Sequence, residues 1–214
     1  AECPPTFGVA PGRVVALVAG GADALTRSVE GAEDDTDAAV RDLAGRQPGP
    51  RDLVIGIAAS GTTPYTCAAV SAARAAGAPT GFIYCYAGAQ PEADVLVCLD
   101  TGAEPLDGST RLKAGTATKC ALNTISTGAF ALAGYVYRGH MVGVQPTNAK
   151  LRARALGMVR ALTGCDGTAA QTALDEAGGD VRVATLMRTQ GMGAAAARER
   201  LLAAGGRLDR ALDG

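Results

Sequence analysis

Short, nearly continuous apolar runs separated by helical patterns are the feature that most constrains the fold of this 214-residue chain. Parallel strands give such runs when helices cover both faces of their sheet. Helical spacing between the runs, at Asp35–Leu43 and Pro64–Ala76, indicates a β-α-β succession. We therefore predict an α/β domain of three layers, a parallel sheet flanked by helices. The predicted strands are Val14–Ala19, Leu53–Ala58, Gly81–Tyr86 and Ala93–Leu99.

The second half of the chain is mostly helical in pattern. Residues Ser109–Tyr137 have apolar side chains at intervals of three and four, with Ser109 or Thr110 as cap, and we expect this helix to pack on the sheet. After Asn148, short helical patterns alternate with Gly-rich or Asp-containing turns. We therefore predict a sheet domain at 1–149 and a small helical domain at 150–214. The helices expected in the second domain are Lys150–Leu162, Thr168–Ala177, Val181–Thr189 and Ala194–Ala204.

The composition argues against several classes of protein. The net charge of −1 comes from 20 basic and 21 acidic residues with no long run of either sign, which argues against nucleic acid or a membrane surface as partner. Six scattered cysteines and the single His140 have no zinc-ligand spacing, so we expect no metal site. Free cysteines in apolar runs fit a reducing cytoplasm. No apolar run reaches the roughly 18 to 20 residues of a membrane-spanning helix.

The turn after the second predicted strand has the residues of an anion-binding loop. It reads Ser60-Gly61-Thr62-Thr63-Pro64 and joins a buried strand to a helix that opens with proline. Ligands of open α/β sheets bind beyond the carboxyl ends of the strands. Ser60, Thr62 and Thr63 are therefore candidate phosphate donors, and a plain strand-to-helix turn is the alternative.

A second candidate anion site opens the long helix. Gly108–Ala117 combines small, polar and cationic residues at a helix start, where backbone N–H groups and the helix dipole attract anions. The candidate donors are Ser109, Thr110, Arg111 and Lys113. An ordinary capped helix with a solvated first turn is the alternative.

Acid–base chemistry in this chain would come from carboxylates, because His140 is the only imidazole and no thiol has an evident activating neighbour. Glu33 lies in the carboxylate-dense stretch Glu30–Asp35, just before a predicted helix. Favourable charge near a helix N-terminus is the simpler explanation for Glu33. Glu2, taken alone, is only a residue near the end of the chain.

Four motifs that occur together and in order resemble one family. The family is the N-acetylmuramic acid 6-phosphate etherases, enzymes built on the sugar isomerase (SIS) fold and related to the glucokinase regulatory proteins. The resemblance covers the chain from Glu2 to its C-terminus. The motifs are Glu2-Cys3-Pro4-Pro5-Thr6-Phe7-Gly8, Val29-Glu30-Gly31-Ala32-Glu33-Asp34-Asp35, Ile57-Ala58-Ala59-Ser60-Gly61-Thr62-Thr63-Pro64-Tyr65 and Gly108-Ser109-Thr110-Arg111-Leu112-Lys113-Ala114-Gly115-Thr116-Ala117.

The resemblance implies an etherase of cell-wall amino sugar recycling, a carbon–oxygen lyase without metal or organic cofactor. The reaction gives N-acetylglucosamine 6-phosphate and D-lactate. Glu2 and Glu33 match the acid–base pair proposed for the family, with Glu2 as the acid that serves the ether oxygen and Glu33 as the base at C2. The resemblance also implies a cytoplasmic homodimer and a C-terminal helical bundle of the ubiquitin-associated type.

The chain departs from the family pattern in ways that leave alternatives open. The second sugar-phosphate loop usually carries arginine where this chain has Thr62, which leaves Arg111 or Lys113 to meet more of the phosphate charge. This change favours a non-catalytic sugar-phosphate regulator of the same fold as the alternative, and an aldose–ketose isomerase is a third. Family members also carry a strand and a first phosphate loop ahead of the segment that matches Glu2. We therefore expect the 214 residues alone to be inactive.

Overall fold

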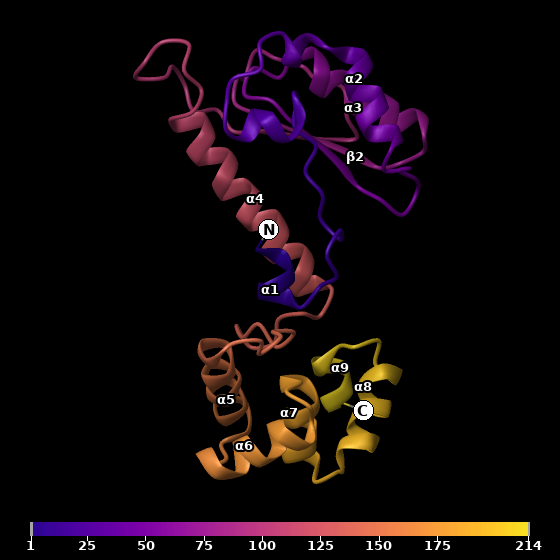
Figure 1. Cartoon of the computed structure of the whole chain (residues 1–214), viewed down its shortest axis with the longest axis vertical. Coiled ribbons are helices and arrows are strands. Elements are labelled where there is room, and N and C mark those ends of the chain that lie inside the picture. The colour runs from indigo at the N-terminus through magenta and orange to yellow at the C-terminus, as the bar shows by residue number, and fades with distance from the viewer. Residues whose placement is uncertain (1, 214) are drawn as a thin grey trace. The chain divides into compact units, whose positions relative to one another are not determined.

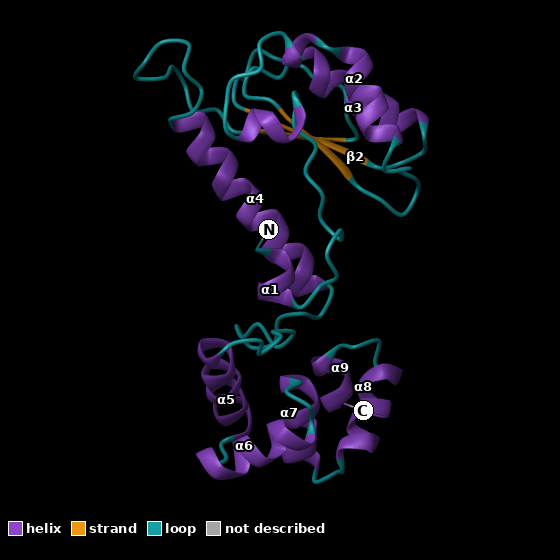
Figure 2. Cartoon of the chain, viewed as in Figure 1, coloured by secondary structure: helices purple, strands orange, loops and turns teal. Residues whose placement is uncertain are grey.

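The computed structural model describes residues 2–213, which form two compact units. The unit Val15–Asn123 is built on a parallel sheet in the order β1-β2-β3, drawn in orange in Figure 2. Val54 pairs with Thr80, and Gly81 with Val95. The predicted α/β class and three of the four predicted strands are therefore confirmed. The strands are β1 Val54–Ile57, β2 Thr80–Tyr84 and β3 Val95–Cys98.

Two helices form a layer on this sheet. Helix α3 (Pro64–Ala75) packs on β1 and β2, and α2 (Thr36–Ala44) packs on α3, as Figure 1 shows. Asp35 caps α2, because its carboxylate accepts from the Ala38 N–H at 2.8 Å. Short 3₁₀ turns, η1 (Gly21–Leu25) and η2 (Ala32–Asp34), precede α2. The buried side chains between sheet and helices include Ala58, Val70, Phe82, Tyr84 and Ala89.

The apolar run Val14–Ala19 was predicted to be a strand, and that prediction is wrong. A strand needs a neighbouring edge for its backbone hydrogen bonds, and none of the described strands pairs with this run. Its valines are instead exposed, Val14 by 61% and Val15 by 46%. Leu17 packs against Leu43 and its neighbours beneath α2.

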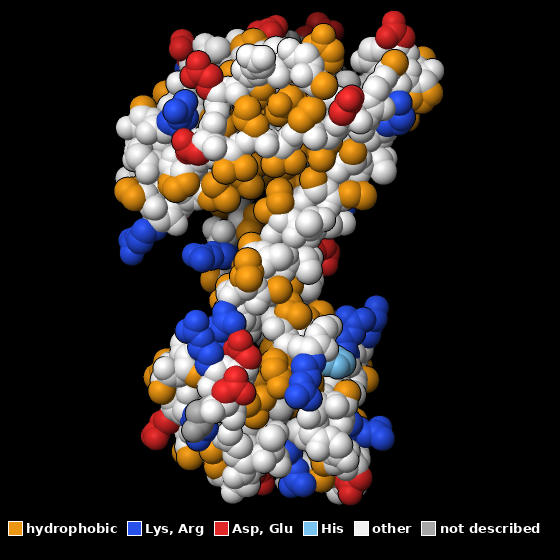
Figure 3. All heavy atoms as spheres, turned by 180° about the vertical axis from the view of Figure 1, so that it is seen from behind, with side chains coloured by type: hydrophobic (Ala, Val, Ile, Leu, Met, Phe, Trp, Pro, Cys, Tyr) orange, Lys and Arg blue, Asp and Glu red, His pale blue; other side chains and the backbone are white. Residues whose placement is uncertain are grey.

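The outer strands of the sheet are only partly covered. Strand β2 is buried along its length, as predicted for a strand with both faces covered. Ile57 of β1 and Val95 and Leu96 of β3 are exposed, because these strands form the edges of a three-stranded sheet. Figure 3 shows hydrophobic side chains gathered at the surface of this unit.

The long helix α4 spans Lys113–Leu132, so it is shorter than the predicted Ser109–Tyr137. Residues 110–112 form a turn ahead of it, and Gly134, with φ of 89°, follows its end. The predicted caps were wrong, because the first N–H groups of α4 are bound by the carboxylate of Glu104. The first two turns of α4 lie beside Cys85, directly after β2.

The other compact unit combines the residues up to Val14 with those from Thr124 onward. Its N-terminal helix α1 (Cys3–Phe7) ends at Gly8, and Phe7 stacks on Phe130 with ring centroids 4.5 Å apart. The C-terminal helices surround one buried cluster that includes Val159 and Leu186. The helices are α5 Ala149–Thr163, α6 Gly167–Glu176, α7 Val181–Gln190, α8 Ala194–Ala203 and α9 Leu208–Asp213.

Four of these five helices match predicted patterns, and α9 was not predicted. Asn148 caps α5 by accepting from the Leu151 N–H at 2.9 Å, so this residue has a structural role. The compact unit that holds the helices also includes Thr124–Asn148. The division between residues 149 and 150 stays a prediction.

Candidate functional site

The loop between β1 and α3 holds three of the predicted phosphate donors. Ser60 Oγ accepts from the Thr62 N–H at 3.2 Å and from the Thr62 hydroxyl at 3.1 Å. Both bonds use the oxygen of Ser60 as acceptor, which leaves its own O–H to donate outward. Gly61 between them has φ of 75°, and Thr63 precedes the Pro64 that opens α3. The loop therefore presents neutral hydroxyl and N–H donors.

The other four predicted donors lie in the segment before α4 and at the first residue of that helix. Ser109 is half-buried, and its N–H donates to the Leu106 carbonyl at 3.0 Å. Thr110 and Arg111 are exposed, and within residues 2–213 no hydrogen bond or ion pair holds the Arg111 guanidinium. The Lys113 ammonium donates to the Thr101 carbonyl at 2.6 Å. Arg111 is thus presented to solvent, whereas Lys113 ties the segment to residue 101.

A carboxylate occupies the N-terminus of α4, where backbone donors for a phosphate were predicted. Glu104 accepts from the N–H groups of Lys113 and Ala114, both at 2.9 Å. The hydrogen bond from Ala114, followed by that from Lys113, lowers the pKa of Glu104. Glu104 therefore holds the position that the predicted anion would take at these two groups.

Cys85 joins the two donor segments at the carboxyl ends of β1 and β2. Its N–H donates to the carbonyl of Ala59, the residue before Ser60, at 2.9 Å. Its Sγ lies 3.9 Å from both the Ala114 carbonyl oxygen and the Thr118 hydroxyl oxygen. The strand-end position that ligands favour in open α/β sheets is therefore bordered by both predicted segments.

The two predicted acid–base residues lie in different compact units. Glu33 lies in η2, which packs against α3, and its side chain is exposed. Glu2 occupies the N-cap position of α1, where its carbonyl accepts from the Thr6 N–H at 3.1 Å. Its side chain is also exposed.

Sequence reasoning missed Glu104 and Cys85. Glu104 is nine and ten residues away from the amides it binds, beyond the range of local capping patterns. Cys85 was read only as a small apolar residue at a strand end, and its burial agrees with that reading. A carboxylate shortly before a glycine-rich helix start was the one available signal for Glu104.

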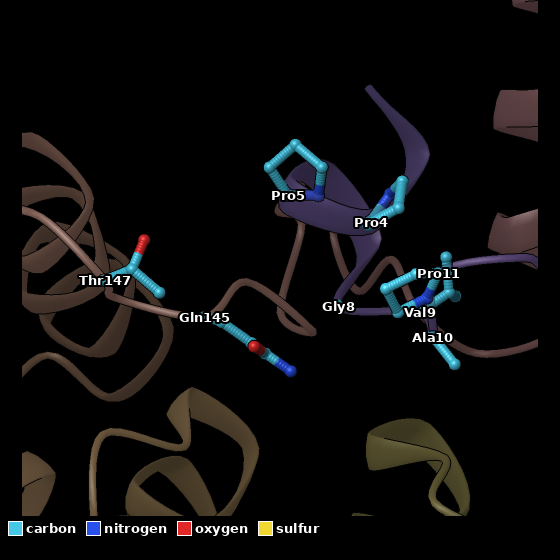
Figure 4. Close-up of a pocket in the computed structure, with 8 residues that line it drawn as sticks. All are labelled: Pro4, Pro5, Gly8, Val9, Ala10, Pro11, Gln145 and Thr147. Carbon is cyan, nitrogen blue, oxygen red and sulfur yellow. The ribbon is translucent and has the colours of Figure 1, made fainter. Parts of the chain in front are cut away.

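A surface cavity of about 380 Å³ lies in the unit that contains α1. In Figure 4 the prolines of the Glu2 motif lie on one side of it and Gln145 and Thr147 on the other. Its lining has no charged side chain to meet a phosphate, and we assign it no role. The lining residues are Pro4, Pro5, Gly8, Val9, Ala10, Pro11, Gln145 and Thr147.

Residues 2–213 contain neither a candidate metal site nor a candidate membrane-spanning helix. No three or more side chains of His, Cys, Asp or Glu are grouped so that they would hold a metal ion. In the same described range, no helix combines the length and the hydropathy needed to span a bilayer.

Comparison with known proteins identifies the family. A profile of the glucokinase regulatory protein N-terminal SIS domain matches residues 8–74. An N-acetylmuramic acid 6-phosphate etherase from Cutibacterium acnes is 49% identical over 100% of this chain and 71% of its own length. The enzyme of the same name from Deinococcus radiodurans is 50% identical over 96% of this chain and 68% of its own, and that from Geobacillus thermodenitrificans is 48% identical over 99% and 72%. These matches confirm the resemblance, and the chain belongs to the N-acetylmuramic acid 6-phosphate etherase family.

Proposed function

We propose that this chain cleaves the C3 lactyl ether of N-acetylmuramic acid 6-phosphate. The products are N-acetylglucosamine 6-phosphate and D-lactate, and the enzyme is a carbon–oxygen lyase of amino sugar recycling. The observation that carries the proposal is the identity of 46% to 50% with etherases over nearly the whole chain. Retention of both glutamate motifs adds support, because the chemistry needs two acid–base groups.

The reaction is an elimination followed by a hydration. In the open-chain sugar the C1 aldehyde acidifies the C2 proton, which Glu33 removes. The C3–O bond breaks and Glu2 gives a proton to the departing lactate oxygen. Water then adds at C3 of the unsaturated aldehyde, Glu2 takes its proton, and C2 is protonated again. One carboxyl group has to be protonated while the other is ionised, so their environments in the assembled site have to differ.

The sugar phosphate binds, in this proposal, beyond the ends of β1 and β2. The loop after β1 supplies the neutral donors Ser60, Thr62 and Thr63, and the turn before α4 supplies Ser109, Thr110 and Arg111. Arg111 is the cation best placed to face the phosphate, since it is exposed and unbound within residues 2–213. Lys113 contributes charge nearby while its ammonium braces Thr101.

Assembly and location belong to the same proposal. We infer a homodimer in the cytoplasm, as the family resemblance implies. Six free cysteines in a chain of this size agree with a reducing compartment. The C-terminal helices act as a packing or assembly module of the ubiquitin-associated type, because their polar surface residues show no arrangement that demands chemistry.

The test is D-lactate release from N-acetylmuramic acid 6-phosphate. We expect Glu2→Gln and Glu33→Gln each to lower kcat by about 10² to 10⁴, the usual contribution of a general acid or base. Glu30→Gln is the matched control, because Glu30 is an exposed carboxylate in the same acidic stretch. Full lactate release by either glutamate variant would remove that residue from the mechanism.

A non-catalytic sugar-phosphate regulator is the second candidate. Two observations favour it: the match to the glucokinase regulatory protein profile, and Thr62 in place of the usual arginine. Such a regulator binds the sugar phosphate without releasing lactate. Calorimetric binding of the sugar phosphate without lactate release would establish the regulator in place of the etherase.

A further inference from the structure

The carboxylate of Glu104 holds the start of α4 in place. Its two oxygens accept separately from the N–H groups of Lys113 and Ala114, at 2.9 Å each. These N–H groups belong to the first turn of the helix, whose donors have no partner within the helix itself. The bond is therefore a bidentate, charge-assisted cap supplied from nine and ten residues upstream.

This cap closes a loop around the predicted phosphate donors. A second tie runs beside it, from the Lys113 ammonium to the Thr101 carbonyl at 2.6 Å. Inside the loop, the Ser109 N–H donates to the Leu106 carbonyl, and the Gly115 N–H of α4 donates back to the Thr110 carbonyl of the loop at 2.9 Å. Residues 105–112 are thus fixed at both ends, and they include Ser109, Thr110 and Arg111.

The cap also decides which groups of this segment meet an anion. The first N–H groups of α4 are already bound to a carboxylate, so an incoming phosphate does not gain from them. The side chains of the turn remain: the hydroxyls of Ser109 and Thr110 and the exposed guanidinium of Arg111. Correct orientation of these side chains then depends on the turn that carries them.

We propose that Glu104 is a positioning residue for the substrate phosphate, which orders the turn of Ser109, Thr110 and Arg111 through its bonds to Lys113 and Ala114. This inference rests on the proposed function, because it takes the phosphate of the sugar as the ligand of the turn. Glu104 itself does not touch the substrate. Its effect is on binding of the phosphate and not on the acid–base steps of Glu2 and Glu33.

The first experiment is a kinetic comparison of Glu104→Gln with the unmutated protein. The amide NH₂ of glutamine faces one of the two backbone N–H groups as a second donor, so the bidentate cap is lost. We expect KM to rise about tenfold and kcat to stay within about twofold, the pattern of lost uniform binding. Asp107→Asn is the matched control, because it removes an exposed carboxylate from the same loop without touching the cap, and we expect it to leave KM unchanged.

Inhibition by inorganic phosphate distinguishes a role in phosphate binding from a role in general stability. Its inhibition constant reports on phosphate binding alone. We expect its inhibition constant to rise by the same factor as KM in Glu104→Gln. A lower KM in this variant would overturn the proposal, because Glu104 would then compete with the phosphate. A fall in kcat at constant KM, or an equal rise of KM in Asp107→Asn, would also overturn it.

Two further measurements test the role of Glu104 separately from the proposed function. If the unmutated protein releases no lactate, the proposed function fails, and calorimetric binding of the sugar phosphate to the same variants still tests the role of Glu104. If Glu104→Gln does not fold, Glu104→Asp replaces it, with a carboxylate one methylene shorter that reaches only one N–H group. We expect this variant to bind phosphate with an affinity between those of the unmutated protein and an uncapped one. An affinity equal to the unmutated value would overturn the proposal.

Discussion

Gly61→Ala tests whether the proposed phosphate loop after β1 depends on a residue without a side chain. Gly61 has φ of 75°, in the left-handed region, where an alanine costs about 1 to 2 kcal/mol. A Cβ at this position would lie 2.7 Å from the Cβ of Ala89 and 3.5 Å from Tyr84. Overpacking of this kind costs about 1 to 3 kcal/mol more. We therefore expect Gly61→Ala to lower the free energy of unfolding by about 2 to 5 kcal/mol.

Gly77→Ala separates the two contributions. Gly77 has φ of 80°, yet the nearest atom to its added Cβ is Pro50 Cγ, 3.8 Å away. This variant carries the conformational cost without the overlap, so we expect a loss of about 1 to 2 kcal/mol. It lies after the C-terminal end of α3, whereas the loop precedes α3, so we expect phosphate binding to remain normal.

Hydrogen exchange of the β2 amides, Thr80–Tyr84, measures the free energy of opening of this unit in both variants. Inorganic phosphate binding is measured in parallel. Gly61→Ala should weaken it, because a shifted backbone breaks the bonds from Thr62 to Ser60 Oγ. Equal losses of stability in the two variants would refute the argument from overlap. Normal phosphate binding by Gly61→Ala would refute the role of the loop.

The remaining predictions concern side chains within each of the two units. Burial, followed by the hydrogen bond to Asp42 at 2.7 Å, raises the pKa of Tyr65 to about 12. Because the proton is held more tightly in the folded protein, stability should fall as the pH rises from about 10 to about 12. Tyr65→Phe should lower the free energy of unfolding by about 1 kcal/mol at neutral pH. It should also abolish this part of the fall in stability at alkaline pH, as measured by urea titrations. Leu186→Ala, in the buried C-terminal cluster, should cost about 2 to 5 kcal/mol, and Leu202→Ala at an 80% exposed position about 0.5 kcal/mol or less; circular dichroism melts should show that order, and a reversed order would contradict the assigned core.

Most helices and three strands could be predicted because their signals are local. Asp35 and Asn148 cap their helices from within three residues, and Pro64 opens α3 where the pattern places it. The prediction of a strand at Val14–Ala19 was wrong because a strand needs a neighbouring strand to pair with. The apolar content of a segment carries no information about that neighbour. Helix α9 was missed because Leu208–Asp213 has only six residues, too few to show a period.

The candidate site also combines features with a local sequence signal and contacts that have none. The candidate donor residues stand in two contiguous segments, so they could be proposed from composition and strand-end position, and their role in binding stays a prediction. The cap from Glu104 to α4 is a contact across a loop, and local rules favoured Ser109 or Thr110 as the cap instead. The sequence pattern placed the start of α4 four residues too early, so it also misplaced the N–H groups of the first helical turn. The predicted backbone site for the phosphate depended on those groups.

The structure indicates which side chain could meet the phosphate charge in a loop that has Thr62 where the family usually has arginine. The Thr62 hydroxyl donates to Ser60, so the loop after β1 offers neutral donors and leaves the charge of the phosphate to other residues. Lys113 is bound to Thr101 through its ammonium, whereas the Arg111 guanidinium is exposed. Under the proposed function, charge compensation for a dianionic phosphate therefore falls mainly on Arg111, and we propose that its orientation depends on the turn that Glu104 holds. In this proposal, the absence of one cation makes the orientation of another cation more important, and the carboxylate of Glu104 provides that orientation by binding the first N–H groups of α4.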